Sequence, residues 1–317
     1  MAAILRVARR GVLNESDMSE QAAGEFYTAA MSNSDLHPDT VARLLAPSLG
    51  LSGCVHAYIW RDTTRAAHLT EEQRSGWFPA TPFCGLSWTI EGCGSQVLGE
   101  GALQALPSGG LIFGPRSSPV QFRSAAGARI FMVAILPESL HALTGLDLSL
   151  LVDRHGSIDA LLGPDWQALN ARLLAAEDEA QCQQIFEAFL LPRWRAHRDI
   201  GGPSPRRYRD WMQQLATRAV AAGHGASLRQ VERRIKQWSG QSLRALRRVS
   251  RSEQTFFQVR RELEAGELVW SALAQDLGYA DQAHLCRETR RVTGFSPDEL
   301  RQRIETDEAF WAYRVWV

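Results

Sequence analysis

The sequence predicts an α+β fold, in which a small antiparallel β-rich domain with helices precedes an all-α domain of two helix-turn-helix units joined by a long helix. Three observations predict it. Short strand-like apolar runs separated by Gly, Pro and Ser occupy the first half of the chain. Helical apolar spacing dominates the second half, and one capped helical pattern occurs there twice, 54 positions apart.

The β-rich domain is predicted to follow a flexible extension. Residues 1–35 mix arginines with acids and lack a strong apolar period, which argues against a targeting segment. Residues 36–198 are assigned to the β-rich domain, whose strand-like runs are CVHAYIW, CGLSWTI, LIFGP, PVQF and RIFMVAIL. Helical spacing begins at Pro137, and from about Ile158 to His197 it predicts two helices that either close the β-domain or pair with a second subunit.

A composition change marks the boundary between the two domains. Residues 199–205, DIGGPSP, are predicted to be the linker, because two Gly, two Pro and one Ser make up five of the seven residues. The helical domain is placed at 206–304, with its two units at 208–240 and 268–294. Residues 305–317 form a tail whose Trp311, Tyr313 and Trp316 are apolar enough to dock on another surface.

The second unit has clear helix-start and helix-stop signals. A helix from Leu268 to Leu277 should end at Gly278, because glycine tolerates the positive φ that follows many helices. Asp281 can cap the next helix, whose inward face is Leu285 and Val292. Gly294 closes that helix, and SPDEL then supplies the cap and proline that start another.

The first unit repeats this design at a constant offset. Ser227 matches Asp281, Gly240 matches Gly294 and Ser242 matches Ser296, while Ser227 and Gln230 form a capping box. A helix from Tyr208 to Ala222 precedes it, and a long helix from Leu243 to about Ala265 bridges the two units.

Charge is divided between the two halves of the chain. The formal net charge is +0, yet residues 203–304 hold 19 Arg and Lys against 11 Asp and Glu, which leaves 16 against 24 elsewhere. A basic domain beside an acidic one is expected when one of them meets nucleic acid. From charge alone, solvated arginine-rich helix faces remain the alternative.

The two motifs SLRQVERRIKQWSGQSLRALRR and LGYADQAHLCRETRRVTGFSPDEL closely resemble the DNA-binding domain of AraC/XylS-type transcription regulators. The β-rich domain loosely resembles the cupin-like sensor domains that precede such domains. The sequence departs from the family pattern at Ile235 and Thr289, where a core Phe is usual, and at Leu243, where a Pro is common. Thr289 is expected to loosen the second unit, because a hydroxyl replaces a large apolar group.

The resemblance implies which residues contact DNA. The base-reading positions that it implies, whose side chains suit base edges, are Arg229, Glu232, Arg233, Gln282, Ala283 and Arg287. The residues expected to hold phosphates are Ser227, Lys236, Ser242 and Arg290. Arg248 and Arg251, on the bridging helix, are expected to be either salt-bridged or DNA-bound.

Other chemistry finds little support in the sequence. Aromatic residues of the β-domain either line a ligand pocket or form plain core, and the candidates are Trp60, Trp77, Phe83 and Trp88. The histidines are scattered, with no H-x-H pair followed by Glu, so no metal and no cofactor are predicted. The five cysteines include no C-x-x-C pair, and no hydrolase, nucleotide-triphosphatase or dehydrogenase motif occurs, so no enzyme activity is predicted.

These observations predict a sequence-specific DNA-binding transcription regulator, an activator by the commoner family role, whose N-terminal domain senses a signal or mediates dimerisation. The alternative is a metal-binding or catalytic cupin-like domain fused to a DNA-binding tail. The implied partners are double-stranded DNA with two major-groove segments about one turn apart and RNA polymerase, while a small-molecule effector and a homodimer stay open. With no long apolar run, no membrane span is expected. The odd number of cysteines without a C-x-x-C pair and the lack of a signal-peptide pattern predict the cytoplasm, in association with the bacterial nucleoid.

Overall fold

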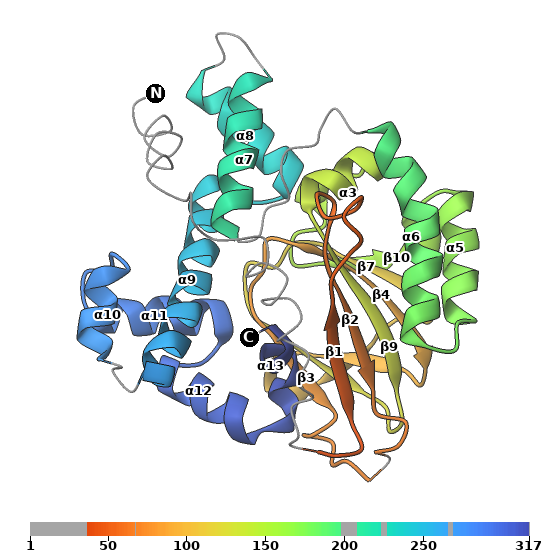
Figure 1. Ribbon diagram of the computed structural model, residues 1–317, viewed down its shortest axis with the longest axis horizontal. Helices are drawn as coiled ribbons and strands as arrows, with labels where there is room; N and C mark the ends of the chain where they lie inside the picture. Colours follow the sequence, from red (N-terminus) through yellow and green to blue (C-terminus); the bar gives the residue numbers. More distant parts are fainter. Residues whose placement is uncertain (1–36, 67, 198–207, 223–226, 266–268, 317) are drawn as a thin grey trace.

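The computed structural model describes residues 37–66, 68–197, 208–222, 227–265 and 269–316 (Figure 1). The strands gather on one side of the molecule, with α5 and α6 along their outer face, and the helices from α7 to α12 gather on the other. The last helix, α13, lies beside β1 and β3 (Figure 1). The predicted extension at 1–35 and linker at 199–205 lie outside the described residues.

Two antiparallel sheets form the β-rich half. The larger has the strand order β1-β2-β9-β4-β7-β10 and the smaller β3-β8-β5-β6. The strands are β1 Val41–Leu45, β2 Val55–Asp62, β3 Ser75–Phe78, β4 Cys84–Glu91, β5 Gly94–Val97, β6 Leu103–Ala105, β7 Gly110–Phe113, β8 Val120–Ser124, β9 Arg129–Ile135 and β10 His155–Ser157. Alternation along β2 sends Tyr58 and Trp60 to one face of the larger sheet and Ile59 and Arg61 to the other.

Helices after the last long strand cover one face of the larger sheet. They are α3 Pro137–Thr144, α4 Ile158–Leu161, α5 Pro164–Leu174 and α6 Glu179–Ala196. Phe186 of α6 packs against Trp88 and Phe131 of the sheet, and Trp88 donates a 2.8 Å hydrogen bond to the Oδ1 atom of Asn170 on α5. The apolar residues that predicted two helices after Ile158 therefore build the core of the β-domain.

Six further helices form the C-terminal half. They are α7 Tyr208–Ala221, α8 Leu228–Ser239, α9 Leu243–Ala265, α10 Trp270–Asp276, α11 Gln282–Thr293 and α12 Pro297–Thr306. The two predicted units correspond to α7 with α8 and to α10 with α11, and α9 is the predicted bridging helix. The predicted helix start at Leu268 falls outside the described residues, and in the structure α10 begins at Trp270 with Val269 as its N-cap.

The tail docks on the β-domain. The short helix η5, Glu308–Phe310, and α13, Trp311–Trp316, lie on β1 and β3. The Glu308 carboxylate accepts hydrogen bonds from Arg61 at 2.6 Å, from Arg314 at 2.9 Å and from Thr40 at 3.2 Å, and all of these groups are shielded from solvent. A buried carboxylate needs such partners to offset its lost hydration. The tail therefore holds the two halves together.

A shared core also joins the halves. Phe83 and Leu136 of the β-domain pack with Trp211, Leu215 and Ile235 of the first unit. The backbone contributes as well, since the Ala80 N–H donates to the Val292 carbonyl at 2.8 Å. The β-domain and the helical half thus form one continuous body in the described residues.

Four of the five strands that were not predicted have only three or four residues, and the fifth, β1, has the sequence VARLL. The five strand-like runs correspond to β2, β4, β7, β8 and β9, whereas β1, β3, β5, β6 and β10 were not predicted. The sequence of β5, GSQV, has one apolar residue and that of β10, HGS, has none. Such strands are held by pairing with a neighbour, and their own residues carry no apolar pattern that would reveal them.

Candidate nucleic-acid interface

The first recognition helix, α8, is fixed at both ends by local chemistry. The Ser227 hydroxyl accepts from the Gln230 N–H, and the Gln230 side chain accepts from the Ser227 N–H, so the predicted capping box forms. Gly240 ends the helix at φ 71°, a conformation that favours glycine. Val231 and Ile235 are buried against α7, and this places the opposite face of α8 in solvent.

Three predicted base-reading residues lie on that opposite face. Arg229, Glu232 and Arg233 are all exposed. The neighbouring Arg234 differs, because its guanidinium donates to the Ala219 carbonyl of α7 at 3.2 Å and so braces the unit. The arginine pair in the sequence therefore divides into one outward and one structural residue.

The second recognition helix, α11, repeats these features. The Asp281 carboxylate accepts from the His284 N–H at 2.6 Å and caps the helix, and Gly294 ends it at φ 91°. Leu285 and Val292 are buried as predicted. The outward residues Gln282, Ala283 and Arg287 are exposed, and these are the base-reading candidates of this unit.

The residues predicted to hold phosphates also face solvent. Ser227, Lys236, Ser242 and Arg290 are all exposed. Ser227 and Ser242 each cap a helix, since the Ser242 hydroxyl accepts from the Ala245 N–H at the start of α9. An exposed helix start offers backbone N–H groups and a favourable dipole to a phosphate.

An arginine groove lies between α9 and α11, and it contains Arg248, Arg251 and Arg287, which the sequence had already singled out, beside further arginines. Its volume is about 530 Å³, and its arginines are Arg244, Arg247, Arg248, Arg251, Arg287 and Arg291. Glu288 is the one acid in the lining, where it pairs with Arg248 at 3.0 Å and with Arg291 at 3.8 Å. Arg251 stacks over Tyr279 with its guanidinium carbon 5.4 Å from the ring centroid.

Six arginines against one glutamate leave the groove strongly positive beside the base-reading residue Arg287. Such a groove attracts phosphates. Arg244 and Arg247 were not among the predicted DNA contacts. Their spacing of three and four residues from Arg248 and Arg251 puts all four on one helical face, and that signal was available in the sequence.

A family model agrees with this geometry. The model for a helix-turn-helix domain matches residues 220–303, which include α8, α9, α10 and α11. The C-terminal part is an AraC-type helix-turn-helix DNA-binding domain. The match does not extend into the β-domain.

Solved structures resemble the chain weakly. An apo ToxT variant from Vibrio cholerae is 10% identical, with 77% of this chain and 95% of that chain covered at a TM-score of 0.35. ToxT from Vibrio cholerae with a bound unsaturated fatty acid is 9% identical, with coverage of 71% and 93% at a TM-score of 0.31. The AraC-like transcriptional activator CuxR is 10% identical, with coverage of 94% and 95% at a TM-score of 0.18. No curated protein matches the chain.

A cavity of about 530 Å³ lies inside the β-domain and reaches the DNA-binding domain. The sheets contribute mainly apolar walls, including Ile59, Phe113, Phe122 and Met132. The helical half contributes residues of α9, α12 and α13, among them Phe256, Leu300 and Trp311. A molecule in this cavity would therefore touch both halves of the protein.

The structure places most of the predicted pocket aromatics elsewhere. Phe83 lines the cavity, but Trp60 and Trp88 face the opposite side of the larger sheet, in the core under α5 and α6. Trp77 packs edge-on against Phe295 with ring centroids 5.0 Å apart. Alternation along a strand assigns its residues to two faces of the sheet, but it does not determine which of the two faces lines the cavity.

Arg116 is one of five arginines that line the cavity, together with Arg61, Arg74, Arg123 and Arg301. Arg116 is buried, and its Nη1 donates to the Asp153 carbonyl at 3.0 Å. Its Nη2 is buried and has no hydrogen-bond partner in the part of the chain that the structure describes. Burial lowers the pKa of this guanidinium. An acidic group in the cavity would satisfy it.

In the described residues, no helix has the length and apolar character needed to cross a bilayer.

Proposed function

We propose that this protein is a sequence-specific transcription regulator that reads two adjacent major-groove segments of DNA. The observation that carries the proposal is the pair of capped helices, α8 and α11, each of which exposes three side chains suited to base edges. A basic helix face that has no DNA partner would not be expected to recur 54 positions later with the same caps, buried face and outward residues.

The bridging helix supports binding to two segments. The first unit packs on α9 through Leu246, and the second contacts it through the Thr255–Tyr279 hydrogen bond of 2.9 Å and through Val259. Two recognition helices on one rigid support suit an operator whose two segments lie about one turn, roughly 34 Å, apart. The arginine groove on α9 and α11 would hold the phosphates near the second segment.

Activation through RNA polymerase is proposed from the family role alone. The N-terminal domain is proposed to sense a largely apolar small molecule that carries an acidic group, because most of the cavity wall is apolar and the buried Nη2 of Arg116 on that wall lacks a partner among the described residues. Since residues of α9 and α12 also line the cavity, an occupant would act on the position of the recognition helices. Dimerisation by this domain stays a prediction.

Arginine substitutions on the two helices test DNA reading. Arg233→Ala and Arg287→Ala should each cost about 1 to 3 kcal/mol at the specific site and relax base preference there. Arg172→Ala is the matched control, because Arg172 is an exposed arginine on α5 and its loss removes the same charge. Binding-site selection from random DNA, followed by electrophoretic titration, measures both effects. A double variant that binds the selected site as well as the control would contradict the proposed readout.

A filled cavity tests effector sensing. Met132→Trp should occupy the space between the sheets, and Arg116→Met should remove its buried cation. If a library of apolar carboxylic acids yields a compound that alters operator affinity, both variants should bind it at least 10-fold more weakly, while operator affinity without the compound stays unchanged. Equal binding of the compound by all three proteins would place the effector site elsewhere.

A further inference from the structure

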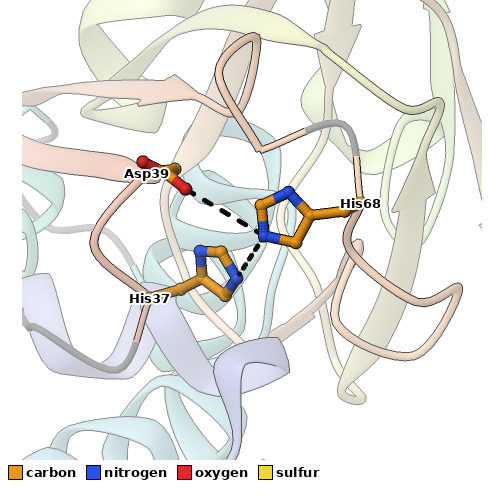
Figure 2. A group of neighbouring side chains, drawn as sticks. All are labelled: His37, Asp39 and His68. Carbon is orange, nitrogen blue, oxygen red and sulfur yellow. Dashed lines mark hydrogen bonds and ion pairs between the residues drawn. The ribbon is translucent and has the colours of Figure 1, made fainter.

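Three potential metal ligands meet at the rim of the β-domain, outside the cavity. Figure 2 shows His37 and Asp39, which precede β1, beside His68 from the loop between β2 and β3. All three side chains point toward one another (Figure 2). The absence of a metal site was predicted from sequence spacing, and 31 positions separate His37 from His68. The fold brings them together.

The distances suit a common ion. The Nε2 atoms of His37 and His68 are 3.1 Å apart, and the Nε2 atom of His68 lies 4.0 Å from a carboxylate oxygen of Asp39. One ligand atom from each of the three residues lies within 4.8 Å of the others. Ligands bound tetrahedrally about 2.0 to 2.2 Å from a zinc ion are roughly 3.3 to 3.6 Å from each other. Small side-chain rotations would bring the three atoms to that spacing.

Solvent access and charge also favour a cation. The side chains of His68 and Asp39 are 63% and 48% exposed, so an ion can reach them without opening the fold. In the part of the chain that the structure describes, the ion pair recorded for Asp39 is the one with His68, and no arginine neutralises this carboxylate. Two imidazoles and one carboxylate form a ligand set that suits zinc and related ions better than calcium or magnesium.

We propose that His37, Asp39 and His68 bind a divalent transition-metal ion of the zinc class through His37 Nε2, His68 Nε2 and the Asp39 carboxylate. Three protein ligands leave at least one coordination position for water or another small ligand. The hydrogen bond between the two imidazoles is then the arrangement that the ion replaces, and the proton between the rings moves to the Nδ1 atom of its own imidazole as the metal binds.

The site lies next to the contact that holds the tail. The hydroxyl of Thr40, one residue beyond Asp39, lies 3.1 Å from the His37 carbonyl and 3.2 Å from the Glu308 carboxylate, and its single proton is shared between these two acceptors. Glu308 in turn pairs with Arg61 and Arg314. A bound ion would tie the residues before β1 to the β2–β3 loop and so stabilise the docked tail. We therefore expect the metal to raise the thermal unfolding midpoint of the full chain.

Metal titration of the full-length protein tests the proposal. The protein is stripped with chelator and studied in a Cys93→Ser background, because Cys93 is an exposed thiol that would itself attract zinc. Zn²⁺ binding is measured by competition with a chromophoric chelator, and Co²⁺ reports coordination through its visible absorption. We expect one strong equivalent, a tetrahedral cobalt spectrum and a higher unfolding midpoint with zinc.

Three variants and one control decide the assignment. His37→Gln and His68→Gln should each weaken zinc binding at least 10-fold and abolish the tetrahedral spectrum, since even outer-shell changes cost about 10- to 100-fold in metal affinity. Asp39→Asn should also weaken binding at least 10-fold, because it removes the negative charge of a direct ligand. His197→Gln, which alters a histidine at the end of α6, should leave binding unchanged. Equal unfolding midpoints without metal establish that the variants fold. The proposal would be overturned if the protein bound no equivalent of zinc strongly, or if both histidine variants still bound one. The contact between His37 and His68 would then be an imidazole hydrogen bond alone.

Discussion

The two helix-turn-helix units share a local design but depend on the rest of the protein in different ways. In both, a buried hydroxyl near the end of the recognition helix bridges to the residues beyond it: Ser239 contacts the Ile235 and Gln241 backbones, and Thr293 contacts those of Thr289 and Phe295. The following residues then diverge. Gln241 donates to the Arg116 carbonyl of the β-domain at 3.1 Å, whereas Phe295 packs on Trp77 and Phe310.

The first unit is completed by the β-domain. Phe83 and Leu136 belong to its core, and buried Glu138 accepts from the Trp211 indole at 2.8 and 2.9 Å and from Arg218 at 2.8 Å. Burial raises the pKa of Glu138 against the opposing effect of Arg218. The second unit instead has a small core of its own, made of Leu273, Ala274, Tyr279 and Leu285.

This difference indicates which unit a change in the β-domain would move. A shift of Phe83 or Glu138 acts directly on α7 and α8, while α10 and α11 would feel it through α9, the tail and a few edge contacts. The β-domain is therefore expected to control the first recognition helix more tightly than the second.

The largest difference between the two units is expected when one core side chain of each is truncated. Phe83→Ala should cost about 3 to 5 kcal/mol and loosen α8, because a large aromatic leaves the shared core. Leu285→Ala, in the second unit's own core, should cost about 2 to 5 kcal/mol and loosen α11 alone. Urea unfolding measures the cost, and amide hydrogen exchange locates it. Equal exchange in both helices for both variants would mean that the units share one core.

The second-largest effect is expected from acid, which should lower the stability of the protein through a buried histidine beside the core of the first unit. His56 contacts Phe83 and Trp316, and burial lowers its pKa from the usual 6.5 to about 4. The unfolded chain therefore takes up a proton below about pH 6.5 that the folded chain takes up only near pH 4, so stability falls as the pH falls through this window. The loss at pH 5 is about 2 kcal/mol.

Chemical denaturation of the wild type and His56→Gln between pH 7 and pH 5 measures this dependence. The variant should lose less stability over that range than the wild type, whatever its stability at pH 7. Parallel curves for the two proteins would show that other groups carry the acid sensitivity.

The smallest expected effect comes from replacing one buried hydroxyl of the second unit with a methyl group. Thr289 is buried, and its hydroxyl has no hydrogen-bond partner among the described residues. Thr289→Val should therefore stabilise the second unit by about 1 kcal/mol, since it removes an unsatisfied polar group. Thr293→Val is the matched control and should destabilise by about 1 kcal/mol, because its hydroxyl makes the bridge at the helix end. Thermal unfolding compares the two, and a destabilised Thr289→Val variant would imply that the hydroxyl is satisfied.

Local interactions explain why much of the DNA-binding domain was predictable. The caps at Ser227 and Asp281 and the glycines at 240 and 294 act over a few residues, so their types and spacing suffice to place α8 and α11. Burial of Leu285 and Val292 follows from helical periodicity in the same way. The long β-strands were visible for a similar reason, because their apolar runs are contiguous.

Contacts between distant residues were decided only by the tertiary structure. The sequence by itself determined two capped recognition helices, their outward residues and an apolar tail. It did not determine that Glu308 would pair with Arg61, that His37 would meet His68, or that Phe83 would complete the core of α8. Each of these depends on which faces of the sheets and helices meet. That choice minimises exposed apolar surface and unpaired charge over the whole chain, and no local pattern encodes it.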